Sequence, residues 1–440
     1  MKVKTNDKKR TASVHSLGCR LNQYEGISLE GKLRDAGYEI VPFGNEADLG
    51  VINTCTVTNE ADAKSRTAIR KFGRKNPEAI TVVVGCYSQI SANEVAMVEG
   101  VDYVIGNHDK MNFLNYVGDQ KPESPVIIRE RIDRNDFTLG FVGETNFTQR
   151  ANLKIQDGCD FMCSFCVIPF ARGRARSRDW WDLFREVDEM IKKGVREIVL
   201  TGVNLGTYES DGKDFVRLID ELNRVDRLDR LRISSIEPTT IPDELLERMA
   251  DSCHVLTPYL HVPLQSGCDR ILGLMKRKYR LSEMREFFSI ATKLVPDLCI
   301  GTDLMTGFPG ESEEDFLETC DTFLSFPFSY CHVFTYSERD GTIAAKSEAQ
   351  IPMQERRSRS NHLRSLSASK RMDWHSEHCG KDVRVLLENP KGEYLSGYTD
   401  NYLKVMVRSQ SGENANHFAT LKIKSAKPEF CVGEILRVEK

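Results

Sequence analysis

Long apolar segments are absent from this sequence. No stretch approaches the roughly 20 consecutive apolar residues that a membrane-spanning helix needs, and no apolar core follows the basic residues at positions 1–10. These absences predict a protein without a membrane span or a secretory signal, whose first ten residues form a short disordered extension. Low-complexity tracts and solenoid repeats are also missing, which excludes a repeat architecture.

An excess of charge of one sign is missing as well. The chain holds 61 Lys and Arg against 65 Asp and Glu, a formal net charge of −4. We therefore expect no DNA partner, and any RNA contact has to come from local basic patches. Hydrophobic residues make up 40% and charged residues 29% of the chain, which is ordinary for a soluble globular protein.

Cysteine, in contrast, is abundant, with 13 in 440 residues. A disulfide framework is typical of small secreted domains, and nothing here indicates secretion. In a cytoplasmic protein, which we expect this to be, closely spaced cysteines more often bind metal or carry out redox chemistry.

The pattern of apolar residues predicts an α/β protein in three segments. In residues 11–122, short β-type runs alternate with helical stretches, which indicates a small domain with a parallel sheet. The charged stretch 121–144 is interpreted as a linker. The expected strands are 13–17, 49–53, 80–85 and 101–105, and the expected helices are 25–36, 60–72 and 93–99.

Residues 146–371 alternate strand and helix six times. A full βα barrel has eight such units, so six predict an open, partial (βα)6 barrel. The expected strands are 152–156, 197–201, 230–234, 259–262, 300–305 and 332–335; the helices after the first five are 180–193, 216–225, 243–249, 282–293 and 313–324.

A basic helix over 354–372 then leads into residues 373–440. Short β-runs separated by Gly, Asn and Pro predict a small all-β barrel of the OB-like kind. These runs are 383–387, 402–407, 419–423 and 435–438.

The strongest chemical signal is a group of three cysteines, Cys159, Cys163 and Cys166, within eight residues. They follow the first strand of the six-unit segment, at the mouth where βα barrels place their sites. Three thiolates can each bind one iron of a cubane cluster and leave the fourth iron open for another ligand. Zinc would require a fourth Cys or His nearby, and none follows in the loop. Three ordinary core cysteines are the weaker alternative.

A second triplet is spread over the first segment. Cys19, Cys55 and Cys86 each come just beyond the end of an expected strand. The carboxyl ends of parallel strands meet at one edge of a sheet, where such sheets bind ligands, and Gly18 and Gly85 permit tight turns. Burial as small hydrophobic residues is the alternative, but three coincidences in one small domain favour a second metal site.

These motifs resemble two known families. The C-x-x-x-C-x-x-C loop on a partial barrel resembles the radical S-adenosylmethionine (SAM) superfamily, and LGCRLNQYE, VINTCTVTNEADAKSR and VGCYSQ resemble the N-terminal domain of the methylthiotransferases. The resemblance implies a radical SAM domain, a C-terminal TRAM domain, and two 4Fe-4S clusters and SAM as cofactors. Further matches over nearly the whole chain are CVIPFARGRARSR, LTGVNLGTY, SSIEP, HVPLQSG, TDLMTGFPGE and HVFTYSERDGTIAA.

The resemblance also implies different roles for the clusters at the two cysteine triplets. In the superfamily, the cluster at the position of Cys159, Cys163 and Cys166 binds SAM at its open iron and cleaves it to a 5′-deoxyadenosyl radical. In the methylthiotransferases, a second cluster, here at Cys19, Cys55 and Cys86, carries sulfur or a methylthio group near the substrate.

Candidate contacts to SAM lie beside the cluster loop and at the ends of other barrel strands. Phe165 matches the aromatic position that the superfamily packs near the adenine, and small residues let a cofactor approach the backbone. Core packing and ordinary capping are the competing interpretations. The candidates are Phe165, Gly202, Asn204, Glu237, Gln265 and Ser266.

Candidate RNA contacts follow the cluster loop. Arg172, Arg174, Arg176 and Arg178 lie in the run ARGRARSR and suit phosphate neutralisation, although internal acids are competing partners for some of them. Tyr398, in the expected TRAM domain, is a candidate for stacking on a base.

The resemblance implies a transferase that adds a methylthio group to C2 of N6-threonylcarbamoyladenosine at position 37 of tRNA, because LGCRLNQYEG, VINTCTVTNEAD and GYTDNYLKV resemble that branch of the family. An electron donor such as a flavodoxin or ferredoxin is then expected. Since C2 is unactivated, no acid–base pair removes its hydrogen, and we name no catalytic His, Asp or Ser. The alternatives are isopentenyl-adenosine in tRNA, a ribosomal-protein aspartate, or a non-catalytic RNA-binding metalloprotein with zinc.

Overall fold

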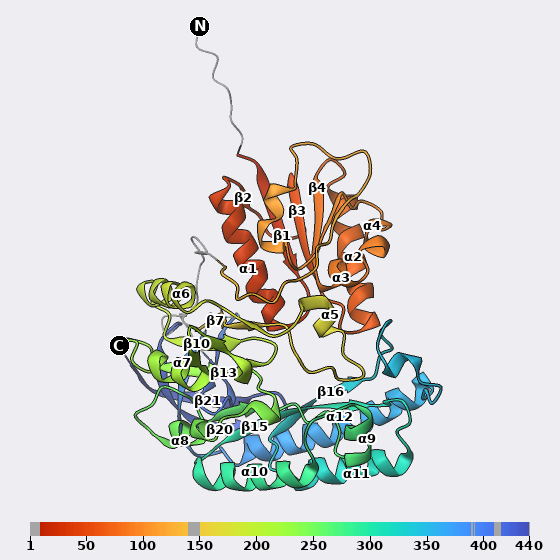
Figure 1. The fold of residues 1–440 in the computed structure, drawn as a ribbon. Helices are drawn as coiled ribbons and strands as arrows, with labels where there is room; N and C mark the ends of the chain where they lie inside the picture. Colours follow the sequence, from red (N-terminus) through yellow and green to blue (C-terminus); the bar gives the residue numbers. More distant parts are fainter. Residues whose placement is uncertain (1–8, 140–149, 389, 391, 409–414, 440) are drawn as a thin grey trace.

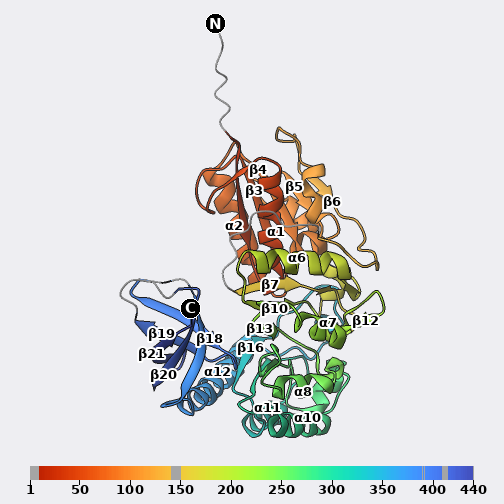
Figure 2. The same ribbon diagram turned by 90° about the vertical axis from the view of Figure 1, so that its left-hand side faces the viewer.

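The computed structural model of this chain describes residues 9–139, 150–388, 390, 392–408 and 415–439. Figure 1 shows an N-terminal sheet above a larger α/β part, and Figure 2 shows a small β-barrel beside that part. The start of the expected second domain at 146, most of the expected N-terminal extension and the end of the expected linker lie outside the described residues. Within them, every helix is too short or too polar to span a bilayer.

The N-terminal part is a six-stranded parallel sheet in the order β2-β1-β3-β4-β5-β6. Apolar residues of α1 pack on one face of the sheet, and those of α2 and α4 on the other, so the predicted parallel α/β domain is confirmed. The strands are β1 (Thr11–Ser16), β2 (Glu39–Ile40), β3 (Leu49–Thr54), β4 (Ile80–Gly85), β5 (Tyr103–Ile105) and β6 (Val126–Ile128). The helices are α1 (Arg20–Asp35), α2 (Asn59–Lys75), α3 (Cys86–Ile90), α4 (Ala92–Ala96) and the 3₁₀ turn Lys110–Asn115.

Two local predictions in this part are wrong. The stretch 121–144 is not wholly a linker, because β6 pairs with β5 at the edge of the sheet; three apolar residues among charges are too short a run to give an alternation signal. Helix α1 begins at Arg20, not at residue 25. Its N-cap, Cys19, makes no side-chain cap bond and its first turn has no acidic residue, so the usual sequence marks of a helix start are missing.

The central part contains the six predicted strands in two parallel, three-stranded halves, β7-β10-β13 and β14-β15-β16. A parallel bridge from Leu231 to Leu256 joins the halves, so the predicted open (βα)6 barrel is confirmed. The strands are β7 (Arg150–Lys154), β10 (Glu197–Thr201), β13 (Arg230–Ile233), β14 (Tyr259–His261), β15 (Cys299–Thr306) and β16 (Tyr330–Thr335). The helices following them are α6 (Trp180–Lys192), α7 (Phe215–Leu222), α8 (Glu244–Ala250), α10 (Leu281–Leu294), α11 (Glu313–Ser325) and α12 (Met353–Ser376).

Alternation along these strands divides the barrel into an apolar outside and a polar inside. Leu153, Leu231 and Leu260 pack with the helices in one large core. Because successive side chains of a strand point to opposite faces, their neighbours Lys154, Arg232 and His261 line the inside of the barrel. The polar inside is the part of this fold that is available for chemistry.

The C-terminal part is a closed barrel in the order β17-β18-β19-β21-β20, which confirms the predicted OB-like fold. Strand β18 was not expected, because Gly397 interrupts its β-type run; a Cβ there would lie 2.1 Å from the Leu386 carbonyl oxygen of β17. The strands are β17 (Asp382–Leu387), β18 (Tyr394–Thr399), β19 (Lys404–Arg408), β20 (Phe418–Ala426) and β21 (Cys431–Val438).

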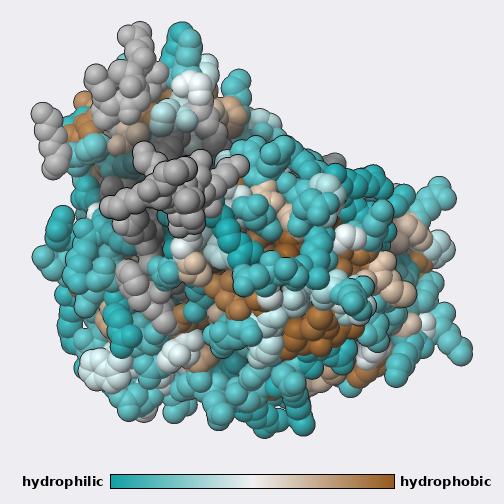
Figure 3. All heavy atoms as spheres, turned by 90° about the horizontal axis from the view of Figure 1, so that it is seen from above, coloured by the Kyte–Doolittle hydropathy of each residue, from teal (hydrophilic) through white to brown (hydrophobic). Residues whose placement is uncertain are grey.

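This small barrel docks on the amino end of the central strands. Arg230 donates hydrogen bonds to the carbonyl oxygens of Tyr398 (3.0 Å) and Arg384 (2.9 Å). Arg232 donates to those of Asp400 (2.9 Å) and Thr399 (3.1 Å). Viewed from the side of the N-terminal domain, the described surface is mainly hydrophilic, with apolar residues in several separate patches (Figure 3).

Candidate metal centres and active site

The loop with Cys159, Cys163 and Cys166 lies between the short strand β8 (Gln156–Asp157) and helix α5 (Ile168–Arg172). Its middle is held by Ser164, whose N–H donates to the Met275 carbonyl (3.0 Å) and whose hydroxyl donates to the Leu274 carbonyl (2.8 Å). The loop is therefore fixed against the far half of the barrel, across its open mouth.

The thiols of this loop lie in an apolar environment. Burial raises the pKa of Cys159 to about 11 and that of Cys166 to about 12, so both are protonated near neutral pH unless a metal displaces the proton. Arg277 donates from Nη1 to the Cys163 sulfur (3.3 Å) and also contacts the Glu237 carboxylate. This arginine, which the sequence did not single out, is a cation placed beside a thiol of the predicted cluster loop.

The second triplet lies where the sequence predicts it. Cys55 and Cys86 directly follow the carboxyl ends of β3 and β4, and Cys19 comes three residues after the end of the adjacent strand β1. Gly18 and Gly85 have φ of 93° and 102°, which side chains rarely tolerate. A Cβ on Gly18 would also come within 2.7 Å of the Cys55 sulfur. The backbone of the first cysteine loop is therefore packed directly against the second cysteine.

The donor sets fit a cluster better than a single zinc ion. Sulfur atoms around a tetrahedral zinc lie roughly 3.8 Å apart, given a Zn–S bond of about 2.3 Å. Among the described residues, the groups whose ligand atoms all lie within 4.8 Å of one another are His261–Asp303–His332 and Cys268–Asp315–Glu318. Neither cysteine triplet is among these groups, and three thiols with no fourth Cys or His in the same loop suit three irons of a cubane better than a four-coordinate zinc.

Helix α5, which lies next to α3 below the N-terminal sheet in Figure 1, brings the two triplets together. It begins two residues after Cys166 and packs against α3, which begins at Cys86. Asn107 joins the two helices, since its amide donates to the Ala171 carbonyl (2.7 Å) and reaches the Cys86 sulfur (3.5 Å). The carboxyl end of the N-terminal sheet therefore faces the mouth of the barrel.

The last residue of α5, Arg172, corrects one prediction from the sequence. It is 2% exposed and binds Glu25 and Asp157 (2.9 and 3.0 Å), so it is not an RNA contact. Burial raises the pKa of the Cys55 thiol to about 11, and the positive charge of Arg172 acts against this increase. Arg172 therefore joins the two domains and favours negative charge at the second triplet.

The other predicted RNA arginines also differ from one another. Arg178 is fully buried against Asp182 and Glu186, which contradicts an RNA contact there. The Arg176 side chain is 11% exposed and lies 3.7 Å from Asp157. The Arg174 side chain is 38% exposed and remains accessible. A run of alternating arginines does not indicate which of them turn inward, because Arg172 ends a helix and Arg176 begins a short strand.

A cavity of about 190 Å³ lies between the two cysteine regions. Phe165, Cys166 and Gln265 line it from the barrel side and Val57 from the loop after Cys55. Phe165 packs edge-on against Phe308, with ring centroids 6.3 Å apart. The two candidates for SAM contact in this cavity, Phe165 and Gln265, are therefore brought together beside the cluster loop.

The remaining SAM candidates have other surroundings. Ser266 is fully buried, and its hydroxyl accepts from the Cys268 N–H (3.2 Å); its contact with SAM stays a prediction. Asn204 is buried and accepts from the Thr240 hydroxyl (2.8 Å). A Cβ on Gly202 would lie 2.8 Å from Leu205. For Asn204, Gly202 and Glu237, contact with SAM stays a prediction.

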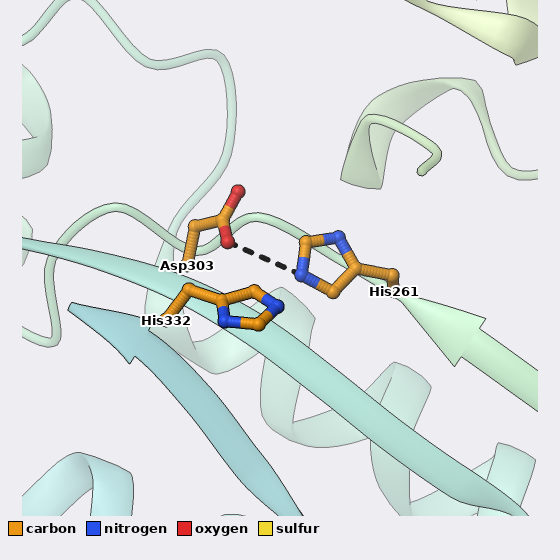
Figure 4. A group of neighbouring side chains, drawn as sticks. All are labelled: His261, Asp303 and His332. Carbon is orange, nitrogen blue, oxygen red and sulfur yellow. Dashed lines mark ion pairs between the residues drawn. The ribbon is translucent and has the colours of Figure 1, made fainter. Parts of the chain in front are cut away.

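The inside of the barrel holds a group that the sequence did not reveal. His261, Asp303 and His332 come from β14, β15 and β16, and Figure 4 shows the two rings and the carboxylate close together. His261 Nε2 lies 3.2 Å from the Asp303 carboxylate, and its Nδ1 lies 2.7 Å from the Ser235 hydroxyl. The three residues are far apart in sequence, so only the strand order brings them together.

Tyr398 lies on β18, facing the central domain. Its ring stacks on Tyr402, with centroids 4.6 Å apart, and Arg150 lies over it at 4.8 Å. The ring is therefore already sandwiched within the protein, and stacking on a base stays a prediction.

Comparison with known proteins gives this architecture a class. Residues 153–323 match the family model "Radical SAM superfamily", and residues 11–106 match "Uncharacterized protein family UPF0004". The solved structure of the radical S-adenosylmethionine methyltransferase TsrM from Kitasatospora setae, with cobalamin and a [4Fe-4S] cluster bound, aligns over 77% of both chains. Its TM-score is 0.58 and its identity 16%, a likeness of fold. Residues 153–323 are therefore a radical SAM domain.

Curated relatives of nearly the same length as this chain define its family more specifically. The threonylcarbamoyladenosine tRNA methylthiotransferase MtaB of Bacillus subtilis is 37% identical over 97% of both chains. That of Aquifex aeolicus is 38% identical over 88% of this chain and 95% of the relative. The tRNA-2-methylthio-N(6)-dimethylallyladenosine synthase of Clostridium novyi is 30% identical over 96% of both chains. The chain belongs to the MtaB-like branch of the radical SAM methylthiotransferase family, a family of transferases that use 4Fe-4S clusters and SAM.

Proposed function

We propose that this protein transfers a methylthio group to C2 of N6-threonylcarbamoyladenosine at position 37 of tRNA. The observation that carries the proposal is the pair of cysteine triplets facing each other across α5, in a chain that matches the MtaB relatives from end to end. We assign the second cluster to residues 11–122, SAM cleavage to 146–371 and RNA contact to 373–440.

In this proposal Cys159, Cys163 and Cys166 hold one cluster and Cys19, Cys55 and Cys86 the other. When bound, the clusters and SAM supply the hydrogen-abstracting radical and the transferred sulfur. The protein contributes position and exclusion of water. Ser164 fixes the first loop across the barrel mouth, and Arg277 balances negative charge at Cys163. The cavity lined by Phe165 and Gln265 gives SAM a place between the two centres.

The RNA reaches this centre, we infer, through an open cleft of about 940 Å³ beside the cluster loop. Four arginines line it, and exposed Phe170 and Met162 lie on the same surface. Cations suit the phosphates and an exposed aromatic ring suits an unstacked base of the anticodon loop. The lining arginines are Arg129, Arg131, Arg134 and Arg174.

The substrate branch rests on similarity. MtaB relatives are 30–38% identical to this chain, and the dimethylallyladenosine relative is 30% identical over a similar length. That relative makes isopentenyl-adenosine the second candidate substrate. We also propose a cytoplasmic location, where tRNA is modified, and a flavodoxin or ferredoxin as electron donor.

Mass spectrometry of tRNA nucleosides tests the proposal. The anaerobically reconstituted protein, given SAM, sulfide and a reductant, should convert threonylcarbamoyladenosine to its methylthio derivative in purified tRNA. Cys163→Ala should abolish both the product and SAM cleavage. Product on isopentenyl-adenosine alone would support the second candidate, and a colourless, zinc-binding protein that does not cleave SAM would refute both.

A further inference from the structure

Arg20 is a cation whose partners inside the protein carry no full negative charge. It directly follows Cys19 and is half-buried. Its guanidinium contacts the Tyr402 hydroxyl and lies 5.7 Å from the centre of that ring. Among the described residues, no carboxylate lies within 4.0 Å of it, and the groups acting on it most strongly are Tyr402, Tyr259 and Tyr330.

Six buried arginines around the barrel differ from Arg20 in this respect. A guanidinium without a counter-charge is unfavourable when it is removed from water, and for these six a carboxylate removes the penalty. The pairs are Arg172–Glu25, Arg178–Asp182, Arg230–Glu197, Arg232–Glu197, Arg277–Glu237 and Arg339–Asp62. The lack of such a partner at Arg20 therefore indicates a place for an external anion.

A second cation reaches the same cluster of tyrosines. Tyr259 and Tyr330 share a hydrogen bond of 2.7 Å, and Tyr259 packs on Tyr402 with ring centroids 4.5 Å apart. Arg371 of α12 lies 5.4 Å from the centre of the Tyr330 ring, and no described carboxylate lies within 4.0 Å of it either. Two arginines from different domains thus meet at tyrosines that supply hydroxyls but no compensating charge.

There is room for a ligand beside Arg20. A pocket of about 430 Å³ opens where α1, the strands β7 and β10, and the small barrel meet. Arg20, Asn152 and Tyr402 line it, together with Arg150, whose charge is taken up by Glu388 at 2.7 Å. The pocket therefore offers one uncompensated cation among neutral polar groups.

We infer that Arg20 binds the carboxylate of the threonylcarbamoyl group on the substrate adenosine. The inference rests on the proposed function and names the group that separates its substrate from isopentenyl-adenosine, whose corresponding substituent is apolar. The reacting C2 must reach the centre that Cys19 would hold, and Arg20 is the next residue, with its Cα about 3.8 Å further along the chain. An arginine presents paired N–H donors to a carboxylate.

Such a site would give strong discrimination. A pocket built around a charged group of the substrate rejects an analogue without that group, because the protein's own polar group is then left unpaired. One charge-assisted hydrogen-bonded pair corresponds to a difference of about ten- to hundredfold in affinity.

Binding of two matched tRNAs tests the inference without turnover. One carries threonylcarbamoyladenosine at position 37 and the other unmodified adenosine; the cluster-loaded protein is used without reductant. Wild-type protein should bind the modified tRNA more tightly, and Arg20→Gln should reduce that preference about ten- to hundredfold. Arg20→Lys should keep part of the preference. Arg34→Gln, on the same helix about 21 Å away, should keep all of it.

Other outcomes overturn the inference. If Arg20→Gln weakens both tRNAs equally, the arginine binds a backbone phosphate; if it weakens neither, the pocket is not used. Iron content and the visible spectrum show whether the variant retains both clusters, and Arg371→Gln, remote from the cysteines in sequence, should reduce the preference by a smaller factor. Failure of the proposed function would look different: wild-type protein would then form no methylthio product on the modified tRNA.

Discussion

Glu25→Gln is the substitution that most directly tests how the two halves of the site are held together. Glu25 lies on α1 of the N-terminal domain and is 1% exposed. Its carboxylate accepts from Lys110 (2.6 Å), Lys154 (2.7 Å) and Arg172 (2.9 Å). Lys154 and Arg172 belong to the barrel domain and Asp157 is the other acid that they contact. One carboxylate therefore joins cations from both domains.

The expected loss of stability follows from this burial. Glutamine has the same shape but no charge, so Lys154 and Arg172 would share Asp157 and Lys110 would lose its carboxylate partner. Removing one partner of a buried ion pair costs about 3–5 kcal/mol. At about 2 °C per kcal/mol for a cooperative unit of about 250 residues, Tm should fall by about 6–10 °C. Glu30→Gln, which removes a surface pair with Arg34 on the same helix, should cost less than about 1 kcal/mol.

The pH dependence of the stability difference between wild type and Glu25→Gln is a second test of the role of Glu25. Burial alone would raise the pKa of Glu25, but Arg172, Lys110 and Lys154 hold it well below its usual range. A carboxylate with a lowered pKa contributes its stability above the unfolded value and loses it as the pH falls through the folded value. The difference between wild type and Glu25→Gln should therefore be complete at pH 7 and narrow only below about pH 4.3.

Thermal unfolding followed by circular dichroism, on cluster-loaded protein, measures both effects. A Tm for Glu25→Gln no lower than that of Glu30→Gln would refute the reasoning. So would a difference that disappears between pH 7 and pH 5, because the charge responsible would then belong to another group.

Three further substitutions test individual parts of the account. Gly18→Ala should remove iron from the second centre, because its Cβ would meet Cys55. Gly37→Ala, at a glycine with a similar φ of 91° and no atom within 4 Å of a Cβ, controls for backbone strain. Equal iron contents in the two variants would argue against the predicted clash between residue 18 and Cys55. Arg277→Gln removes the donor to the Cys163 sulfur and should lower the midpoint potential of the first cluster in an EPR-monitored titration; an unchanged potential would mean that the contact is absent when the cluster is bound. Gly397→Ala places a Cβ against the Leu386 carbonyl and should destabilise the C-terminal barrel by about 1–3 kcal/mol, seen as faster amide exchange in β17 and β18; unchanged exchange contradicts the packing.

The sequence predicts the three folds and the positions of both cysteine triplets because these depend on local patterns. A strand followed by Gly-Cys places a thiol at the carboxyl end of a parallel sheet, and this placement does not depend on the other domains. The errors at Arg172 and Arg178 have the opposite cause, since exposure depends on Glu25, Asp182 and the domains that supply them. The cluster of His261, Asp303 and His332 could not be found for the same reason: three separate strands bring it together.

Iron and sulfide analysis of anaerobically purified protein tests the central claim most directly. The account predicts that wild-type protein holds two 4Fe-4S clusters, and that Cys163→Ala and Cys55→Ala each lose one and keep the other. Of the two variants, Cys55→Ala should still cleave SAM and Cys163→Ala should not. Folded variants that keep both clusters, or a wild-type protein that binds zinc in place of iron, would contradict it.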